Sequence, residues 1–150
     1  MKAGDVMTTG AATIRPDASL AEAAQVMVDN QISGLPVVDD QDKLIGILTE
    51  GDFLRPDQGR KPLLLQLVAS SGATAAAELS SRKVSELMTP APVTIAVETP
   101  IEEIVELMNR HKFKRLPVVT KGKVVGIVSR ANLLLALVRK AQAPAGRRRV

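Results

Sequence analysis

The sequence has 150 residues, the length of one ordinary domain, and its 45% hydrophobic content is sufficient for a core. It contains no cysteine, which excludes a disulfide framework and thiolate metal sites. Residues 1–54 carry 3 basic and 9 acidic side chains, whereas residues 55–150 carry 17 basic and 7 acidic ones, so the second part favours anionic partners.

The first 54 residues predict an extended run, a helix, a hairpin and a second helix. The extended run covers residues 12–14. The helix begins near Leu20, where apolar residues recur at helical spacing. Two apolar runs at 35–38 and 44–48, joined by a polar turn, predict the hairpin, and the second helix is expected from Thr49.

Residues 55–83 are expected to form a helical insertion or linker. Pro56 and Pro62 interrupt it, one short helix is predicted to start near Pro62, and another is predicted over residues 73–79. The pattern of the first 54 residues then returns over residues 84–138, with its second helix from Ser129. Residues 139–150 are expected to form a basic, disordered tail.

The two patterns are copies of each other. GLPVV at 34–38 recurs 81 residues later as RLPVV at 115–119, and Met7-Thr8 recurs as Met88-Thr89. Chance does not preserve order and spacing over such a length, so the chain is a tandem duplication. Each copy reads β-α-β-β-α, which predicts an α+β fold. A half-sheet of two or three strands buries one face only, so the copies are expected to pack around a pseudo-twofold axis.

The duplicated pattern resembles the CBS motif, named after cystathionine β-synthase. The shared elements are Met-Thr, Thr-Ile, Gly-Leu-Pro-Val-Val and Gly-Ile-Leu-Thr-x-x-Asp, and two such motifs in tandem form a Bateman module. The KFKRLPVV run and the segment at 129–134 are also similar to bacterial CBS pairs that carry a BON domain, which does not follow here.

The resemblance implies a regulatory module that binds an adenine nucleotide, with AMP and ATP among the candidates, in a cleft between its motifs. It implies no cofactor, no metal site and an effector protein that remains to be identified. The ligand-binding residues it implies in the first copy are Thr13, Ile14, Ser33, Gly34, Leu35, Pro36, Thr49 and Asp52. Those in the second copy are Thr94, Ile95, Phe113, Lys114, Arg115, Leu116, Pro117, Ser129 and Asn132.

The chemistry of these residues leaves two interpretations of Asp52 open. Its carboxylate can accept both hydroxyls of a ribose diol, or it can form an ordinary helix cap with Thr49. Asn132, in the second copy, is a poorer diol acceptor because its amide has one acceptor oxygen. Lys114 and Arg115 stand where the regulatory γ subunit of AMP-activated protein kinase has a phosphate-binding His-Arg pair, and the arginine fork suits phosphate.

An enzyme is not expected, because His111 is the single histidine and no catalytic triad is possible. Two other functions stay open, namely a structural dimerisation module with empty clefts and nucleic-acid binding through the basic part. A homodimer is expected because the predicted helix of the second copy has a broad apolar face, formed by Ile101, Ile104, Val105 and Met108. The longest apolar stretch, at 63–69, is too short to span a bilayer, so a cytoplasmic protein without a membrane partner is expected.

Overall fold

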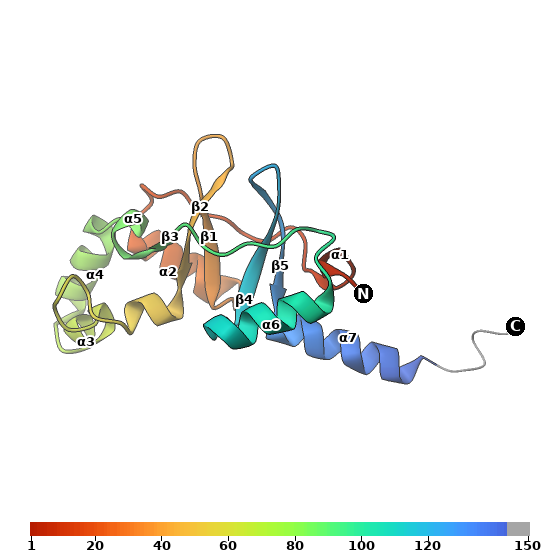
Figure 1. The fold of residues 1–150 in the computed structure, drawn as a ribbon. Helices are drawn as coiled ribbons and strands as arrows, with labels where there is room; N and C mark the ends of the chain where they lie inside the picture. Colours follow the sequence, from red (N-terminus) through yellow and green to blue (C-terminus); the bar gives the residue numbers. More distant parts are fainter. Residues whose placement is uncertain (144–150) are drawn as a thin grey trace, which may run out of the picture. The chain divides into compact units, whose positions relative to one another are not determined.

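The computed structural model describes residues 1–143, which form two compact units (Figure 1). We call residues 12–92 the first-repeat unit, and residues 1–11 with 93–150 the second-repeat unit. Each is a small mixed unit of helices and antiparallel strands, in agreement with the predicted α+β class. The excess of basic residues in the second part of the chain follows this division. The first-repeat unit has 7 basic and 11 acidic residues, and the described part of the second-repeat unit has 10 and 5.

The first-repeat unit is built on a three-stranded antiparallel sheet in the order β1-β2-β3. Helix α2 (Leu20–Asp29) starts where the Ser19 side chain accepts a hydrogen bond from the Glu22 amide, as an N-cap does. It buries its apolar side, which includes Leu20 and Met27. The predicted hairpin is confirmed as β1 (Gly34–Val38) and β2 (Leu44–Thr49).

The second-repeat unit repeats this arrangement. Helix α6 (Ile101–His111) is followed by the antiparallel pair β4 (Arg115–Thr120) and β5 (Lys123–Ser129). Both hairpins have a register shift at the same place, between Val37 and Val38 and between Val118 and Val119. The predicted extended runs form one parallel bridge each, from Ile14 to Val37 and from Ile95 to Val118.

The segment that begins each repeat completes the unit of the other repeat. Helix α1 (Ala3–Val6) leads to Thr8, which pairs with Ile127 of β5. Helix α5 (Val84–Leu87) leads to β3 (Thr89–Pro90), which pairs with β2. Because these two segments are equivalent in the duplication, each unit contains an exchanged Met-Thr segment.

A glycine on the central strand makes room for each exchanged segment. A Cβ built on Gly46 would lie 2.6 Å from the Met88 sulfur and 3.1 Å from the Thr89 carbonyl oxygen. At Gly126 it would lie 2.6 Å from the Met7 sulfur and 3.1 Å from the Thr8 carbonyl oxygen. The glycines of LIGILT and VVGIVS are therefore required by close packing of the Met-Thr backbone.

The second helices of the two repeats differ, and the expectation for the first repeat is wrong. After Thr49 the chain forms only η1, a four-residue 3-10 turn (Glu50–Phe53). Gly51 weakens a helix there, and Pro56 disfavours helical backbone at the residue before it. In the second repeat the predicted helix is confirmed as α7 (Arg130–Gln142). It extends into the segment expected to be a tail, because residues 139–142 are good helix formers, while residues 144–150 lie outside the described chain.

The insertion contains the two predicted helices, α3 (Leu63–Val68) and α4 (Gly72–Ser81). A buried ion pair joins its two ends, since two Arg82 nitrogens each lie 3.1 Å from an Asp57 carboxylate oxygen. The hydrogen bonds from Arg82 hold the pKa of Asp57 below its usual value, and Asp57 in turn raises the pKa of Arg82. This pair therefore closes the insertion by joining its two ends through charges buried inside it.

Candidate functional site

The predicted ligand-binding residues of the first repeat lie along β1 and at the end of the hairpin where β2 ends. Gly34 at the start of β1 faces Thr49 at the end of β2 across the sheet, and the Glu50 amide donates to the Ser33 carbonyl oxygen at 3.0 Å. Ile14 runs beside the same strand, because its amide donates to the Pro36 carbonyl oxygen. Three segments that are distant in sequence thus meet beside β1.

These first-repeat residues differ in how far they can meet a ligand. Leu35 is fully buried and belongs to the hydrophobic core of the unit, and Pro36 is also buried. The amide and carbonyl of Ile14 are both used in bonds to β1, whereas Thr13 next to it is exposed. Side-chain contact with a ligand is therefore expected from Thr13, Ser33 and Thr49 rather than from Leu35.

The carboxylate of Asp52 is the centre of a hydrogen-bond network. One oxygen accepts from the Thr49 amide at 2.7 Å and lies 3.4 Å from the Thr49 hydroxyl. The other accepts from the Thr89 hydroxyl at 3.0 Å and pairs with the guanidinium of Arg55. Arg55 also donates to the Thr89 hydroxyl at 3.0 Å. The cap with Thr49, one of the two interpretations of Asp52, is present in this structure.

The second repeat places an uncharged version of this network at the equivalent point. Asn132 accepts from the Ser129 amide at 2.8 Å and from the Ser129 hydroxyl at 3.0 Å through its side-chain oxygen. Its side-chain nitrogen donates to the Thr8 hydroxyl at 3.1 Å. Thr8 and Thr89 are the exchanged threonines, so each network joins the end of a hairpin to a segment of the other repeat.

The other predicted residues of the second repeat follow the same pattern. Arg115 faces Ser129 across the β4–β5 pair, and the Arg130 amide donates to the Lys114 carbonyl oxygen at 3.1 Å. Leu116 and Pro117 are buried, as their first-repeat counterparts are. Ile95 is hydrogen-bonded to β4, and Thr94 is exposed beside it.

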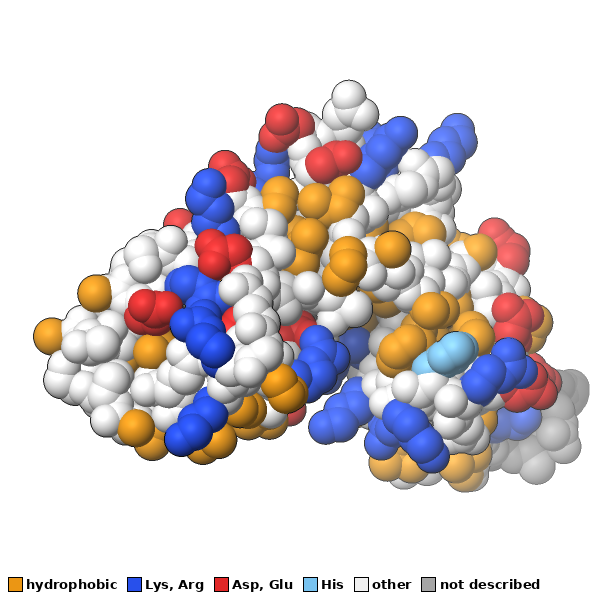
Figure 2. All heavy atoms as spheres, turned by 60° about the vertical axis from the view of Figure 1, so that its left-hand side comes forward, with side chains coloured by type: hydrophobic (Ala, Val, Ile, Leu, Met, Phe, Trp, Pro, Cys, Tyr) orange, Lys and Arg blue, Asp and Glu red, His pale blue; other side chains and the backbone are white. Residues whose placement is uncertain are grey.

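A stacked pair of rings lies next to these cations. The rings of His111 and Phe113 are 5.1 Å apart and nearly parallel, and Lys112 between them takes a left-handed backbone conformation. The pale blue histidine in Figure 2 has Lys and Arg side chains near it. The predicted ligand-binding residues include Phe113 but not its stacking partner His111, which lies two residues earlier in the RHKFKR run.

The apolar face of α6, which was expected to form a dimer interface, is largely buried inside the second-repeat unit. It therefore does not support the expected homodimer. Ile104 and Met108 are buried in the core and Ile101 packs against it, so Val105 alone of the four is exposed, at 40%. Large exposed apolar side chains lie instead on α7. They are Leu134, Leu135, Leu137 and Val138.

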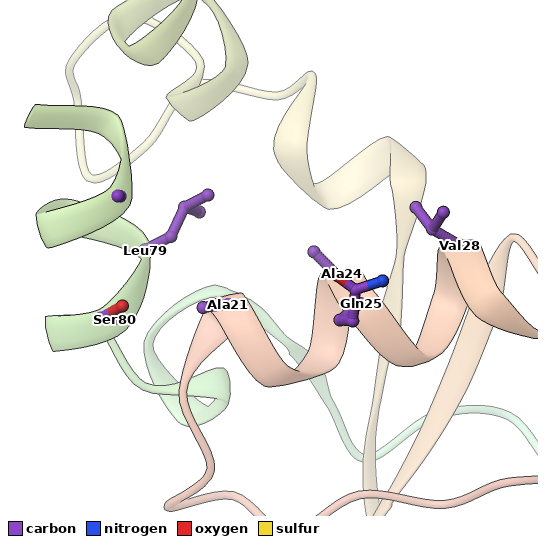
Figure 3. Close-up of a pocket in the computed structure, with 7 residues that line it drawn as sticks. Ala21, Ala24, Gln25, Val28, Leu79 and Ser80 are labelled. Carbon is purple, nitrogen blue, oxygen red and sulfur yellow. The ribbon is translucent and has the colours of Figure 1, made fainter. Parts of the chain in front are cut away.

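The first-repeat unit also has two apolar grooves, which do not suit a nucleotide. One, of about 320 Å³, lies between α2 and α4, where Ala21, Ala24 and Leu79 line it (Figure 3). Its glutamine, Gln25, is bonded to Asp29. The other, of about 360 Å³, runs from α2 to η1 and α3. Neither groove presents a basic side chain to a phosphate.

The comparison with known protein families decides what the chain is. The CBS domain profile matches residues 3–58 and 84–139, which together make up most of the sequence. The chain belongs to the CBS domain family. The match covers both copies of the repeat, so this is a CBS-pair protein.

Individual CBS-pair proteins match along most of this chain. The chloroplastic CBS domain-containing protein CBSX1 of Arabidopsis thaliana is 33% identical over 135 residues, which cover 82% of this chain and 57% of CBSX1. The chain thus spans less than two thirds of that relative. An inosine-5'-monophosphate dehydrogenase of Methanocaldococcus jannaschii is 33% identical over 134 residues, but these are only 23% of the dehydrogenase.

Solved structures of CBS-pair proteins share the fold. The crystal structure of CBSX2 in complex with AMP has a TM-score of 0.74 and 30% identity, and the match covers 94% of this chain and 98% of that one. The CBS domain of a membrane protein from Sphaerobacter thermophilus has a TM-score of 0.74 and 33% identity, with 90% and 86% covered. In this CBS-pair protein, no helix among residues 1–143 is long and apolar enough to cross a bilayer.

Three residues at the site were missed by the sequence reasoning. Thr89 and its counterpart Thr8 were recognised as a mark of the repeat, but they were not assigned to a site. Both copies of the repeat contain this threonine, and that recurrence was the signal that could have assigned it to the site. Arg55 follows Asp52 by three residues, and nothing in the duplication pointed to it, because Leu135 stands at that place in the second copy.

Proposed function

We propose that this CBS-pair protein is a regulatory module that senses an adenosyl ligand, such as AMP, ADP or ATP. The proposal is supported by one observation: three motif segments meet beside each hairpin. The chain is also similar, over 94% of its length, to a CBS-pair protein crystallised with AMP. In the first-repeat unit a ribose diol would use Asp52, and in the second-repeat unit Arg115 with Lys114 would attract phosphates.

Two measurements test this function. Protein purified without added nucleotide is denatured, and the released small molecules are identified by mass spectrometry. The stripped protein is then titrated with adenosine, AMP, ADP, ATP and S-adenosylmethionine in a calorimeter. We expect at least one adenosyl ligand to bind at one site or two per chain. If none of the panel binds at millimolar concentration, the sensing role is wrong and a purely structural role is favoured.

We also propose that the protein is a homodimer, and the support for this has moved from α6 to α7. Four large apolar side chains within five residues of one helix are exposed, and a second copy would cover them. Light scattering at micromolar concentration should give the mass of two chains. Leu134→Glu should shift the mass toward one chain, whereas Lys121→Glu, on a hairpin turn, should not.

A further inference from the structure

Asp52 has no acceptor site left for a ligand in this structure. Its side chain is 0% exposed. Thr49 occupies one carboxylate oxygen with its amide and hydroxyl, and Thr89 with Arg55 occupies the other. An ionised carboxylate accepts about four hydrogen bonds, so a ribose diol must displace at least one of these partners before it reaches Asp52.

Arg55 is the partner that can leave at the lowest cost. The Thr49 amide is fixed at the end of β2, and Thr89 is held in β3 by its pairing with Ile47. The Arg55 side chain, by contrast, is 60% exposed and ends a long flexible stem. The guanidinium can move into water, where it is hydrated. This movement uncovers the Asp52 oxygen that Arg55 shares with Thr89.

We propose that Arg55 competes with the ligand for Asp52 and thereby makes the first-repeat site selective for phosphorylated adenosyl ligands. When a neutral nucleoside binds Asp52, its hydroxyl groups replace the charge-assisted bond from Arg55. Arg55 is then left without an anionic partner. A ligand with a phosphate offers the released guanidinium a new anionic partner. The inference rests on the proposed adenosyl-binding function and adds a residue that sets its specificity.

At the position equivalent to Arg55 the second repeat has no such competitor. Leu135 stands three residues after Asn132, where the first repeat has Arg55, and Asn132 is itself neutral. The competition is therefore a property of one site only. When the chain is titrated with adenosine, the first-repeat site should therefore bind with lower affinity because of Arg55.

The test is calorimetric titration of wild-type protein and Arg55→Gln with adenosine and AMP. We expect Arg55→Gln to bind adenosine about three- to tenfold more tightly, the range of one hydrogen bond, and to bind AMP no more tightly than wild type. Because adenosine is neutral, a change in overall charge does not affect its attraction. Lys61→Gln removes the same charge from an exposed position of the insertion and should leave both affinities unchanged.

A second ligand and a second variant sharpen the result. 2'-Deoxyadenosine offers one hydroxyl less to Asp52, so its gain in Arg55→Gln should be smaller than that of adenosine. Arg55→Lys keeps the charge but loses the planar fork that meets Asp52 and Thr89 together. It should bind adenosine with intermediate affinity, and it decides the question alone if circular dichroism shows that Arg55→Gln is unfolded.

The outcomes separate this proposal from the proposed function. Equal or weaker adenosine binding by folded Arg55→Gln overturns the competition and leaves the sensing function standing. Binding of neither adenosine nor AMP by any of the proteins overturns the sensing function, and the role of Arg55 in specificity falls with it. Tighter adenosine binding together with tighter AMP binding shows that Arg55 blocks the site without selecting for phosphate, which also contradicts the proposal.

Discussion

The two repeats keep the same framework and differ in the charge at its centre. In both, a glycine of the second hairpin strand packs against an exchanged Met-Thr segment. The first-repeat unit then places a buried carboxylate, Asp52, between Thr89 and Arg55, whereas the second-repeat unit places the amide of Asn132 beside Thr8. Backbone packing has thus been conserved between the copies, while the chemistry at the hairpin end has become different.

The two units also differ in what stabilises them. The first-repeat unit includes the insertion, whose ends are joined by Asp57 and Arg82, and Glu86 adds a further bond to the same guanidinium at 2.6 Å. The side chains of Asp57 and Arg82 are 1% and 10% exposed. A buried pair of this kind is costly to break, because the remaining partner stays buried and loses the larger part of its compensation, with Glu86 left close to the guanidinium. The first-repeat unit should therefore be the more sensitive to loss of a single charge.

The largest effect is expected from Asp57→Ala. It leaves Arg82 buried without its main partner, so the free energy of unfolding of the first-repeat unit should fall by about 3–5 kcal/mol. Urea denaturation followed by circular dichroism measures this change. Asp40→Ala is the matched control, because Asp40 pairs with Arg15 but is 94% exposed, and it should cost less than about 1 kcal/mol. Similar losses for both variants would contradict the buried clamp.

A binding experiment sharpens the comparison of the cations. Arg115→Ala should weaken ATP more than adenosine, by about 1–3 kcal/mol, because only the phosphorylated ligand uses a guanidinium. The first repeat has Gly34 at the equivalent position, so no side chain of its β1 replaces Arg115. Titration of both ligands decides the point, with Lys123→Ala as a control for net charge. Equal losses for the two ligands would show that Arg115 shapes the site instead of meeting phosphate.

The shared framework is tested by Gly46→Ala and Gly126→Ala. Each added methyl meets a methionine sulfur and a backbone carbonyl oxygen at closer than normal contact. The sulfur can move but the backbone must shift, so each variant should lose about 1–3 kcal/mol of stability. Hydrogen exchange should locate the loosened amides near Thr89 in the first variant and near Thr8 in the second. Gly72→Ala, where a Cβ meets nothing within 4 Å, serves as the control.

The smallest effect is a dependence of stability on acid. The pKa of Asp57 is lowered in the folded protein, chiefly by its hydrogen bonds with Arg82. Its contribution is therefore fully present above the unfolded value, near pH 4, and is lost as the pH falls through the folded pKa. For this one group the slope cannot exceed about 1.4 kcal/mol per pH unit. Urea denaturation between pH 5 and pH 3 should show a shallower slope for Asp57→Asn than for wild type, and an unchanged slope would reject the assignment.

Sequence reasoning was most successful where a pattern is local and repeated. The two hairpins and the helices α2 and α6 follow from alternation and helical spacing, which are set by neighbours along the chain. The same reasoning failed at η1, where a glycine and a following proline outweighed the analogy with the second repeat. It also overestimated the free apolar surface of α6, because burial depends on which elements pack against a helix and not on its own pattern.

The resemblance to the CBS motif implied that Gly34, Thr49 and Asp52 lie together, whereas the sequence by itself determined the duplication and the strands and helices that follow from it. These are consequences of periodicity and of hairpin pairing, which short stretches of chain encode. Only the tertiary structure decided that Thr89 and Thr8 exchange between repeats, that Arg55 covers Asp52, and that Asp57 pairs with Arg82. Each of these contacts joins side chains whose proximity depends on the path of the intervening backbone. The hydrogen-bond partners of a carboxylate therefore cannot all be read from the local sequence.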